Sequence, residues 1–151
     1  MKLNTRLFGE IEIDENKIIQ FPNGIIGFPD CKHFILIHDE EDQDEGNISW
    51  LQSIEEPVFA MAVIDPLTVK PDYNPMVEDE LLKVIGEVKM ENMFVLVTVT
   101  IPKEIEKISV NLKAPIVVNT SEFKASQWIV EDDYPVKYEI YDILKDGKAG
   151  E

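Results

Sequence analysis

The sequence predicts a mainly β fold: a small closed antiparallel β-barrel of about eight or nine short strands with one short helix. Short alternating or β-branched runs recur along the chain, and turn residues interrupt them about every ten residues. The 151 residues fit one domain with room for a core, and the hydrophobic content of 44% is typical of globular proteins. A barrel is favoured over a sandwich because the sequence shows no obvious protection of sandwich edges.

The first half of the chain is predicted to consist of strands joined by irregular segments. Apolar and polar residues alternate over residues 3–13, and Gly9 interrupts them, so we expect one strand that is bent or bulged at Gly9. Residues 21–30, FPNGIIGFPD, contain two prolines and two glycines and should form an ordered loop. Residues 65–75 contain three prolines and are expected to be irregular. Further strands are expected at residues 18–21, 33–37, 48–54 and 58–64.

The second half is predicted to hold the helix and the strongest strand. Asn74 and Pro75 suit the N-cap and the first position of a helix, and apolar residues follow at helical spacing until Gly86. Residues 94–101, FVLVTVTI, carry β-branched side chains at nearly every other position and predict a strand. We also expect a turn or a single helical turn at residues 104–109, and strands within residues 110–119, 123–130 and 136–144.

Acidic residues greatly outnumber basic ones. Asp and Glu total 30 and Lys and Arg total 14, which gives a formal net charge of −16. A surface of this sign repels phosphate backbones, so we expect no direct binding of nucleic acid. It would attract a basic protein and speed the encounter, although the charge could also serve solubility alone. The residues that we expect to steer such a partner are Asp39, Glu40, Glu41 and Asp42.

Cysteine content and hydropathy bear on the cellular compartment. Cys31 is the single cysteine, which excludes an internal disulfide and a zinc site built on several thiolates. The first residues contain no apolar signal core, and no later apolar run is long enough to span a bilayer. We therefore expect a cytoplasmic protein with no membrane contact.

The motifs of common enzymes are absent from the sequence. No serine lies in a G-x-S-x-G elbow, and residues 24–27, GIIG, lack the lysine and the helix that would follow them in a phosphate-binding loop. Cys31, His33 and His38 are close in sequence, but alternation along a strand would bring only two of them together, and zinc needs three or four ligands. We expect no enzymatic activity, no metal and no cofactor. The alternative is an enzymatic or small-ligand-binding barrel with an interior pocket.

The stretch NLKAPIVVN, residues 111–119, places turn residues around a strongly β-prone tripeptide. Pro115 has no N–H to give to a sheet, and an asparagine stands at each end. In one interpretation Asn111 and Asn119 bond backbone groups that are left open at a corner between two strands. In the other, Pro115 leaves a strand edge unpaired and a partner segment docks there. The sequence alone favours the first.

Several short motifs, taken in order, resemble the family of the flagellar assembly factor FliW. They cover nearly the whole chain: FPNGIIGF (21–28), WLQS (50–53), Asp65-Pro66 followed by Tyr73, VTIP (99–102), NLKAPIVVN (111–119), Gln127 and Tyr134. Two positions depart from the family pattern. Ser126 stands where a glycine or another small residue is usual, and Lys137 replaces an arginine, which keeps the charge but loses the bidentate fork.

The resemblance implies a function in binding proteins. Proteins like this bind flagellin in the cytoplasm, and they bind the small RNA-binding regulator CsrA and stop it from repressing translation of the flagellin message. The resemblance also implies a single FliW-like β-barrel domain over residues 1–151, in agreement with the strand count. We expect the chain to be a monomer with flagellin and a CsrA-type regulator as partners. The contact residues expected from the matched motifs are Asp65, Tyr73, Asn111, Asn119 and Gln127.

Overall fold

The computed structural model describes residues 2–6, 8–38, 48–75, 83–86 and 90–143. The acidic residues Asp39, Glu40, Glu41 and Asp42 lie outside these ranges, and so does most of the helix predicted between Pro75 and Gly86.

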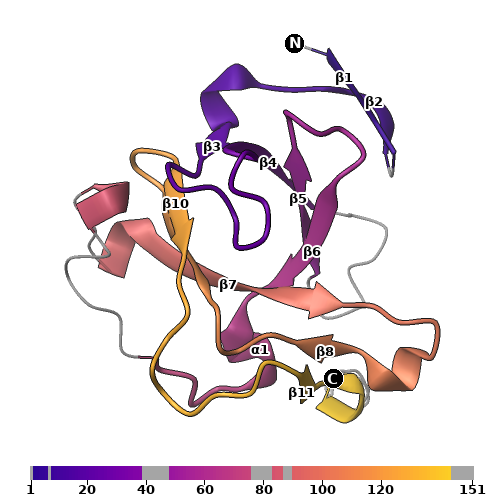
Figure 1. The fold of residues 1–151 in the computed structure, drawn as a ribbon, viewed down its shortest axis with the longest axis vertical. Helices are drawn as coiled ribbons and strands as arrows, with labels where there is room; N and C mark the ends of the chain where they lie inside the picture. Colours follow the sequence, from indigo (N-terminus) through magenta and orange to yellow (C-terminus); the bar gives the residue numbers. More distant parts are fainter. Residues whose placement is uncertain (1, 7, 39–47, 76–82, 87–89, 144–151) are drawn as a thin grey trace.

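Seven strands close a β-barrel, which confirms the predicted fold class (Figure 1). Around the barrel they are β3 (Ile19–Gln20), β4 (His33–His38), β5 (Ser49–Ser53), β6 (Ala60–Ile64), β7 (Met93–Thr100), β9 (Ile116–Asn119) and β10 (Lys124–Gln127). Pairing between β7 and β9 closes the ring. Neighbouring strands are antiparallel except β3 and β10, which run parallel where Gln20 faces Lys124.

The N-terminal segment is a separate hairpin of β1 (Lys2–Thr5) and β2 (Gly9–Glu12). The single bent strand that we expected here is therefore wrong. The Thr5 hydroxyl donates to the Gly9 carbonyl oxygen at 2.9 Å and accepts from the Phe8 N–H at 2.9 Å. Gly9 has a φ of +66°, a conformation that glycine adopts without strain. The side chain of Thr5 thus organises a turn where the alternation alone predicted a continuous strand.

Strand β7 changes partners half way along its length. Its first half pairs with β9, while Val99 and Thr100 pair with β8 (Ser109–Val110). The short strand β11 (Tyr138–Glu139) pairs antiparallel with β8. Between the two ladders, residues 111–115 stand opposite only two residues of β7, Val97 and Thr98. Residues 111–115 therefore form a large bulge, which we call the corner.

The corner resolves the two interpretations of NLKAPIVVN. Strand β9 is paired on both sides, with β7 and with β10. The carbonyl oxygen of Pro115 accepts from the Trp128 N–H at 3.2 Å. The less favoured interpretation, an unpaired edge at Pro115, is therefore wrong, because the proline lies in the bulge before the strand, where no ladder needs its missing N–H.

The helices whose bounds lie within the described residues are short. They are α1 (Pro66–Val69) and 3-10 helices at Glu15–Lys17, Lys83–Ile85, Met90–Asn92 and Ile105–Lys107. The last confirms the helical turn predicted at residues 104–109. Helix α1 lies where we expected irregular chain, which is a correction: Pro66 occupies a first-turn position that tolerates proline, and the Asp65 side chain accepts from the Leu67 N–H at 2.9 Å as an N-cap.

Two apolar clusters hold the barrel and its extension together. The first contains Phe21, Phe34, Leu51, Val63 and Ile116, all fully buried. The second packs α1, β8 and the C-terminal segment against β7; its members include Ile64, Val97, Val110, Leu112 and Ile140. No helix among the described residues has the length and apolar character needed to cross a membrane.

Candidate functional site

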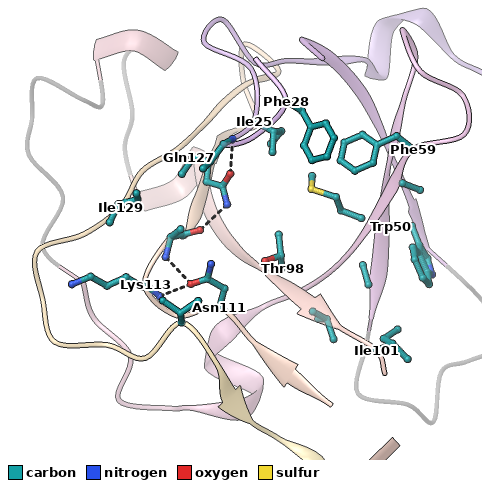
Figure 2. A pocket seen from close by; sticks show the side chains of 17 residues that line it. Ile25, Phe28, Trp50, Phe59, Thr98, Ile101, Asn111, Lys113, Gln127 and Ile129 are labelled. Atoms are coloured by element: carbon teal, nitrogen blue, oxygen red, sulfur yellow. Dashed lines mark hydrogen bonds between the residues drawn. The ribbon is translucent and has the colours of Figure 1, made fainter. Parts of the chain in front are cut away.

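A groove of about 600 Å³ opens beside strands β5, β6 and β7 (Figure 2). Trp50 comes from β5, Met61 and Ala62 from β6, and Thr98 and Val99 from β7. Ala60 and Gln127 come from the ends of β6 and β10. Loops supply the other lining residues: Ile25, Ile26, Phe28, Phe59, Ile101, Asn111, Lys113, Ala114, Ile129 and Val136. Most of these side chains are apolar.

More than half of the large exposed apolar side chains in the described part of the chain line this groove. Nine large apolar residues are exposed among the described residues, and five of them line it: Ile26, Phe28, Ile101, Ile129 and Val136. Ile129 and Val136 are each 65% exposed. Scattered exposed apolar residues are normal, but a cluster of them marks a surface that binds something.

Hydrogen bonds join the two ends of one groove wall (Figure 2). The Gln127 side chain accepts from the Ile26 N–H at 3.1 Å and donates to the Ala114 carbonyl oxygen at 3.1 Å. The Asn111 Oδ1 atom accepts from the N–H groups of Lys113 at 3.0 Å and Ala114 at 3.2 Å. The structure thus brings together two of the predicted site residues, Asn111 and Gln127, as parts of the wall.

The loop at residues 21–30 forms the opposite end of this wall. The N–H and carbonyl groups of Ile25 and Phe28 bond each other, and Gly24 and Gly27 adopt φ values of +71° and +90°. The GIIG stretch therefore forms a tight turn, as predicted, and not a phosphate-binding loop. Phe28 stacks on Phe59 with ring centroids 4.3 Å apart, which anchors the loop against the start of β6.

An acidic lip, residues 129–136, borders the groove beside the corner. The Val130 N–H donates to the Lys113 carbonyl oxygen at 2.9 Å, and the Lys113 ammonium donates to the Asp132 carbonyl oxygen at 2.6 Å. These bonds fasten the lip to the corner. Ile129 and Val136 flank Glu131 and Asp133, whose side chains are exposed, so apolar and negatively charged surface alternate along it.

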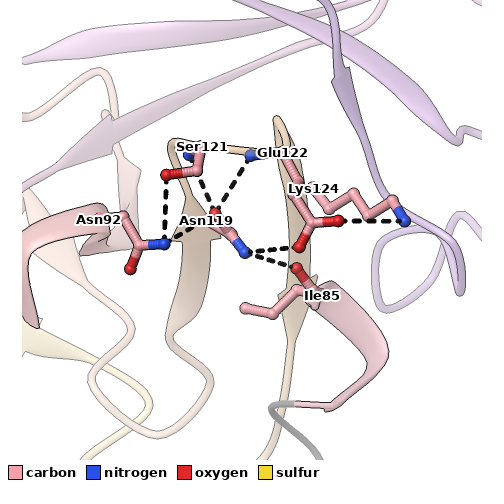
Figure 3. A network of polar contacts seen from close by, with 6 residues as sticks. All are labelled: Ile85, Asn92, Asn119, Ser121, Glu122 and Lys124. Carbon is pink, nitrogen blue, oxygen red and sulfur yellow. Dashed lines mark hydrogen bonds and ion pairs between the residues drawn. The ribbon is translucent and has the colours of Figure 1, made fainter. Parts of the chain in front are cut away.

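Asn119 lies away from the groove, at the end of β9, and is fully buried (Figure 3). Its amide donates to the Ile85 carbonyl oxygen at 2.8 Å, and its Oδ1 accepts from the N–H groups of Ser121 at 2.9 Å and Glu122 at 3.2 Å. The side chain therefore organises the turn between β9 and β10 and ties it to the 3-10 helix at Lys83–Ile85.

Tyr73 and Asp65 also lie outside the groove lining. The Tyr73 hydroxyl donates to the Leu112 carbonyl oxygen at 2.6 Å, and its ring lies 4.6 Å from that of Tyr134. Burial, with smaller contributions from Tyr134 and Asp132, raises the pKa of Tyr73 above its ordinary range. Tyr73 thus supports the corner from its far side, while Asp65 caps α1.

The sequence does not predict the apolar rim, the five exposed residues at the groove. Ile129, Val136 and Ile101 each lie in or at the end of a stretch whose pattern predicts a strand. The available signal was weak: FPNGIIGF places four apolar residues in a loop rich in proline and glycine, and IVEDDYPV places apolar residues around three carboxylates. Exposure could not be inferred from either stretch alone.

Cys31 and His33, two of the residues weighed as metal ligands, have different surroundings in the structure. Cys31 is buried, and the His33 Nδ1 atom lies 2.7 Å from a carboxylate oxygen of Glu55. Partial burial raises the pKa of Glu55, but hydrogen bonds from His33 and from nearby backbone N–H groups outweigh this and hold it below its ordinary value. Within the described part of the chain, no group of three or more metal-ligating side chains converges.

Comparisons with known proteins give a consistent result. A family model described as "FliW protein" matches residues 2–140. A protein of Lachnoclostridium phytofermentans named flagellar assembly factor FliW is 46% identical over 143 residues, which cover 94% of this chain and 92% of the relative. A relative of the same name from Lachnospira eligens is 47% identical over 147 residues, which cover 96% of this chain and 97% of that protein. A crystal structure of the flagellar assembly factor FliW superimposes with a TM-score of 0.85 at 28% identity, covering 93% of this chain and 97% of the other.

Proposed function

The chain belongs to the FliW family of flagellar assembly factors, and on this premise we propose that it acts by binding proteins, without catalysing a reaction. The proposed partners are flagellin and a CsrA-type RNA-binding regulator, and the proposed compartment is the cytoplasm. While flagellin occupies the chain, the regulator stays active. Once flagellin has been exported, the freed chain captures the regulator and relieves its repression of the flagellin message.

The gathering of exposed apolar side chains around one groove carries this proposal. A protein that only had to stay soluble would not collect five such residues at one place. The described barrel core is filled by Phe21, Phe34, Leu51, Val63 and Ile116, which speaks against the alternative of a ligand site in the barrel interior. The groove is bordered by exposed side chains, with Ile129 and Val136 each 65% exposed, and a protein can reach these residues.

Net charge supports the choice of an RNA-binding partner. A protein that holds phosphates needs a basic surface, and a chain with a net charge of −16 attracts such a surface over several ångströms. Once bound, the chain would either cover the RNA site or repel RNA from a neighbouring position. We propose that Asp39, Glu40, Glu41 and Asp42 contribute to this attraction and raise the association rate.

The remaining predicted residues are proposed to act with these features. Asn111 and Gln127 would serve partner binding as parts of the groove wall. Tyr73 supports the corner behind that wall through Leu112. Asp65 and Asn119 are proposed to hold α1 and the β9–β10 turn, so that any effect of changing them on partner affinity would pass through the fold.

The direct test is complex formation between purified components. The chain is mixed with flagellin and, separately, with the CsrA-type regulator of the same bacterium, and complexes are followed by size-exclusion chromatography with light scattering at 50 and 300 mM salt. We expect a monomer that forms a complex with each partner, the regulator complex weakening with salt. Absence of both complexes at 50 mM salt would overturn the proposed function.

The steering role has its own measurement. Changing Asp39, Glu40, Glu41 and Asp42 together to serine should lower the association rate with the regulator about three- to tenfold at low salt and much less at high salt. The dissociation rate should stay the same. An unchanged association rate would show that these four carboxylates play no part.

A further inference from the structure

Beyond the proposed function, on which this step rests, we infer that the groove is the docking surface and that its occupant is an amphipathic helix with an apolar ridge and flanking Lys or Arg residues. The exposed apolar rim of Ile26, Phe28, Ile101, Ile129 and Val136 would receive the ridge. The acidic lip would face the basic flank. Three observations lead to this occupant.

The first observation is that many backbone N–H and carbonyl groups at the groove already have hydrogen-bond partners within the chain. Among the lining residues in strands, Trp50, Ala62 and Val99 are paired on both sides, and Ala60 and Met61, which pair with β5 alone, leave an edge of only two residues. In the walls, the N–H of Ile26 is taken by Gln127, and the N–H and carbonyl of Ala114 are taken by Asn111 and Gln127. An extended peptide that adds a strand needs a free edge with open donors and acceptors. The occupant must therefore be recognised by side chains, as a helix is.

The second observation is the character of the rim. Ile26, Phe28 and Ile101 are each a little under half exposed, whereas Ile129 and Val136 stand 65% exposed at the lip. A helix presents apolar side chains at i, i+3, i+4 and i+7 as one continuous ridge, which suits a groove lined in this way.

The third observation is the sign of the surrounding charge. Glu131 and Asp133 are exposed on the lip between Ile129 and Val136, and the Lys113 ammonium is turned to the Asp132 carbonyl oxygen. Lys137 is a second cation nearby, but the chain as a whole carries 16 more negative than positive charges. A helix that carries Lys or Arg beside its ridge gains from this field, and an acidic helix is repelled.

The chain offers closely matched controls for the rim. Ile101 and Ile105 are 46% and 45% exposed, and only Ile101 lines the groove. Val136 and Val58 are 65% and 63% exposed, and only Val136 lines it. The test variant is the double substitution Ile101→Ser and Val136→Ser, and the control is Ile105→Ser and Val58→Ser. Both remove the same side chains from equally exposed positions and add no charge.

The experiment measures three binding partners against the wild-type chain and both double variants. Two are purified flagellin and the CsrA-type regulator. The third is a fluorescent 18-residue alanine-based helical peptide with leucine at i, i+3, i+4 and i+7 and three lysines beside this ridge, compared with the same peptide carrying glutamate at those three positions. We expect the groove variant to lose about tenfold or more in affinity for at least one protein partner and for the lysine peptide, and the control variant to stay within about twofold. The glutamate peptide should bind about tenfold or more weakly than the lysine peptide.

Other outcomes separate this inference from the proposed function. If the wild-type chain binds flagellin or the regulator and both double variants bind equally well, the groove assignment is overturned while the proposed function stands. If the glutamate peptide binds as well as the lysine peptide, the basic helix is the wrong occupant. If the wild-type chain is a dimer by light scattering and the groove variant alone is a monomer, a second copy of the chain is the occupant. Urea unfolding of both variants confirms that they are folded.

Discussion

The Tyr73 hydroxyl donates a 2.6 Å hydrogen bond to the carbonyl oxygen of Leu112, which lies 39 residues further along the chain. Both residues are buried, with Tyr73 6% and Leu112 0% exposed. The bond joins the segment after α1 to the corner that forms one wall of the groove. The ring centroid of Tyr134 lies 4.6 Å from the ring centroid of Tyr73.

Removal of this hydroxyl should weaken the fold. In Tyr73→Phe the ring remains, but the buried Leu112 carbonyl oxygen loses its hydrogen-bond donor. We therefore expect the free energy of unfolding to fall by about 1–3 kcal/mol. Urea unfolding at pH 7 measures it. Tyr134→Phe is the control, because the Tyr134 hydroxyl accepts from the Asn74 N–H at an exposed position. Equal losses in the two variants would contradict the role given to Tyr73.

The raised pKa of Tyr73 predicts that the folded chain loses stability at alkaline pH. Burial raises the pKa of Tyr73 in the folded chain above its ordinary value of 10.0. Below pH 10 both states keep the proton and stability is unaffected. Above pH 10 the unfolded chain loses the proton first, so the free energy of unfolding should decline by up to about 1.4 kcal/mol per pH unit. The difference between the wild-type and Tyr73→Phe curves isolates this residue, and parallel curves from pH 9 to 11 would refute the prediction.

Local patterns predicted most strands because alternation and β-branching are properties of a few consecutive residues. The run at residues 94–101 is an example, and it appears as β7 over Met93–Thr100. Misses occurred where a single side chain overrode the pattern. Thr5 turns the chain into a hairpin at residues that alternate like a strand, and Asp65 starts a helix in a segment rich in proline.

The groove could not be predicted in the same way. Its rim residues come from loops that are distant in sequence, such as those holding Phe28, Ile101 and Val136, and they meet only because the barrel closes between β7 and β9. Asn111 and Gln127 were identified through a family resemblance. The hydrogen bonds that they share with Ala114 depend on the corner, whose length no local pattern sets.

Asn119 is expected to be indispensable to the turn after β9. Asn119→Ala would leave the Ile85 carbonyl oxygen and the N–H groups of Ser121 and Glu122 without this side chain, at a cost of about 2–4 kcal/mol. Asn119→Asp keeps an acceptor but buries a carboxylate close to that of Glu122. The resulting decrease in the free energy of unfolding should be larger at pH 7 than at pH 5.

Urea unfolding of both variants at the two pH values checks this expectation. The Asn119→Asp carboxyl, with its pKa raised by burial, is protonated more readily in the folded chain, so lowering the pH should recover stability relative to the wild type. Ser121→Ala is a local control, because Ser121 contacts Asn92 at an exposed position. The prediction fails if Asn119→Asp is as stable as the wild type at pH 7.

The two glycines of the turn beside the groove should respond differently to alanine. A Cβ atom on Gly24 would lie 2.5 Å from the Pro29 carbonyl oxygen, whereas one on Gly27 would meet nothing within 4 Å. Both residues have positive φ, so each substitution costs about 1 kcal/mol in backbone strain. Gly24→Ala must also displace backbone and should cost about 1–3 kcal/mol more. Thermal or urea unfolding that ranks Gly27→Ala as the more damaging change would contradict the described turn.

Gln127 should be coupled to Asn111 because both side chains bond the same residue, Ala114. Gln127→Met removes the bonds to both Ile26 and Ala114 and should lower the free energy of unfolding by about 1–3 kcal/mol. Gln127→Glu keeps the acceptor for the Ile26 N–H but sets a carboxylate oxygen against the Ala114 carbonyl oxygen, so it should also lower stability. Combining Gln127→Met with Asn111→Ala tests the coupling: when one change has loosened Ala114, the other has less to remove, so the double loss should fall short of the two single losses by about 0.5–1.5 kcal/mol. Losses that add within about 0.3 kcal/mol would mean that the two side chains hold the groove wall independently.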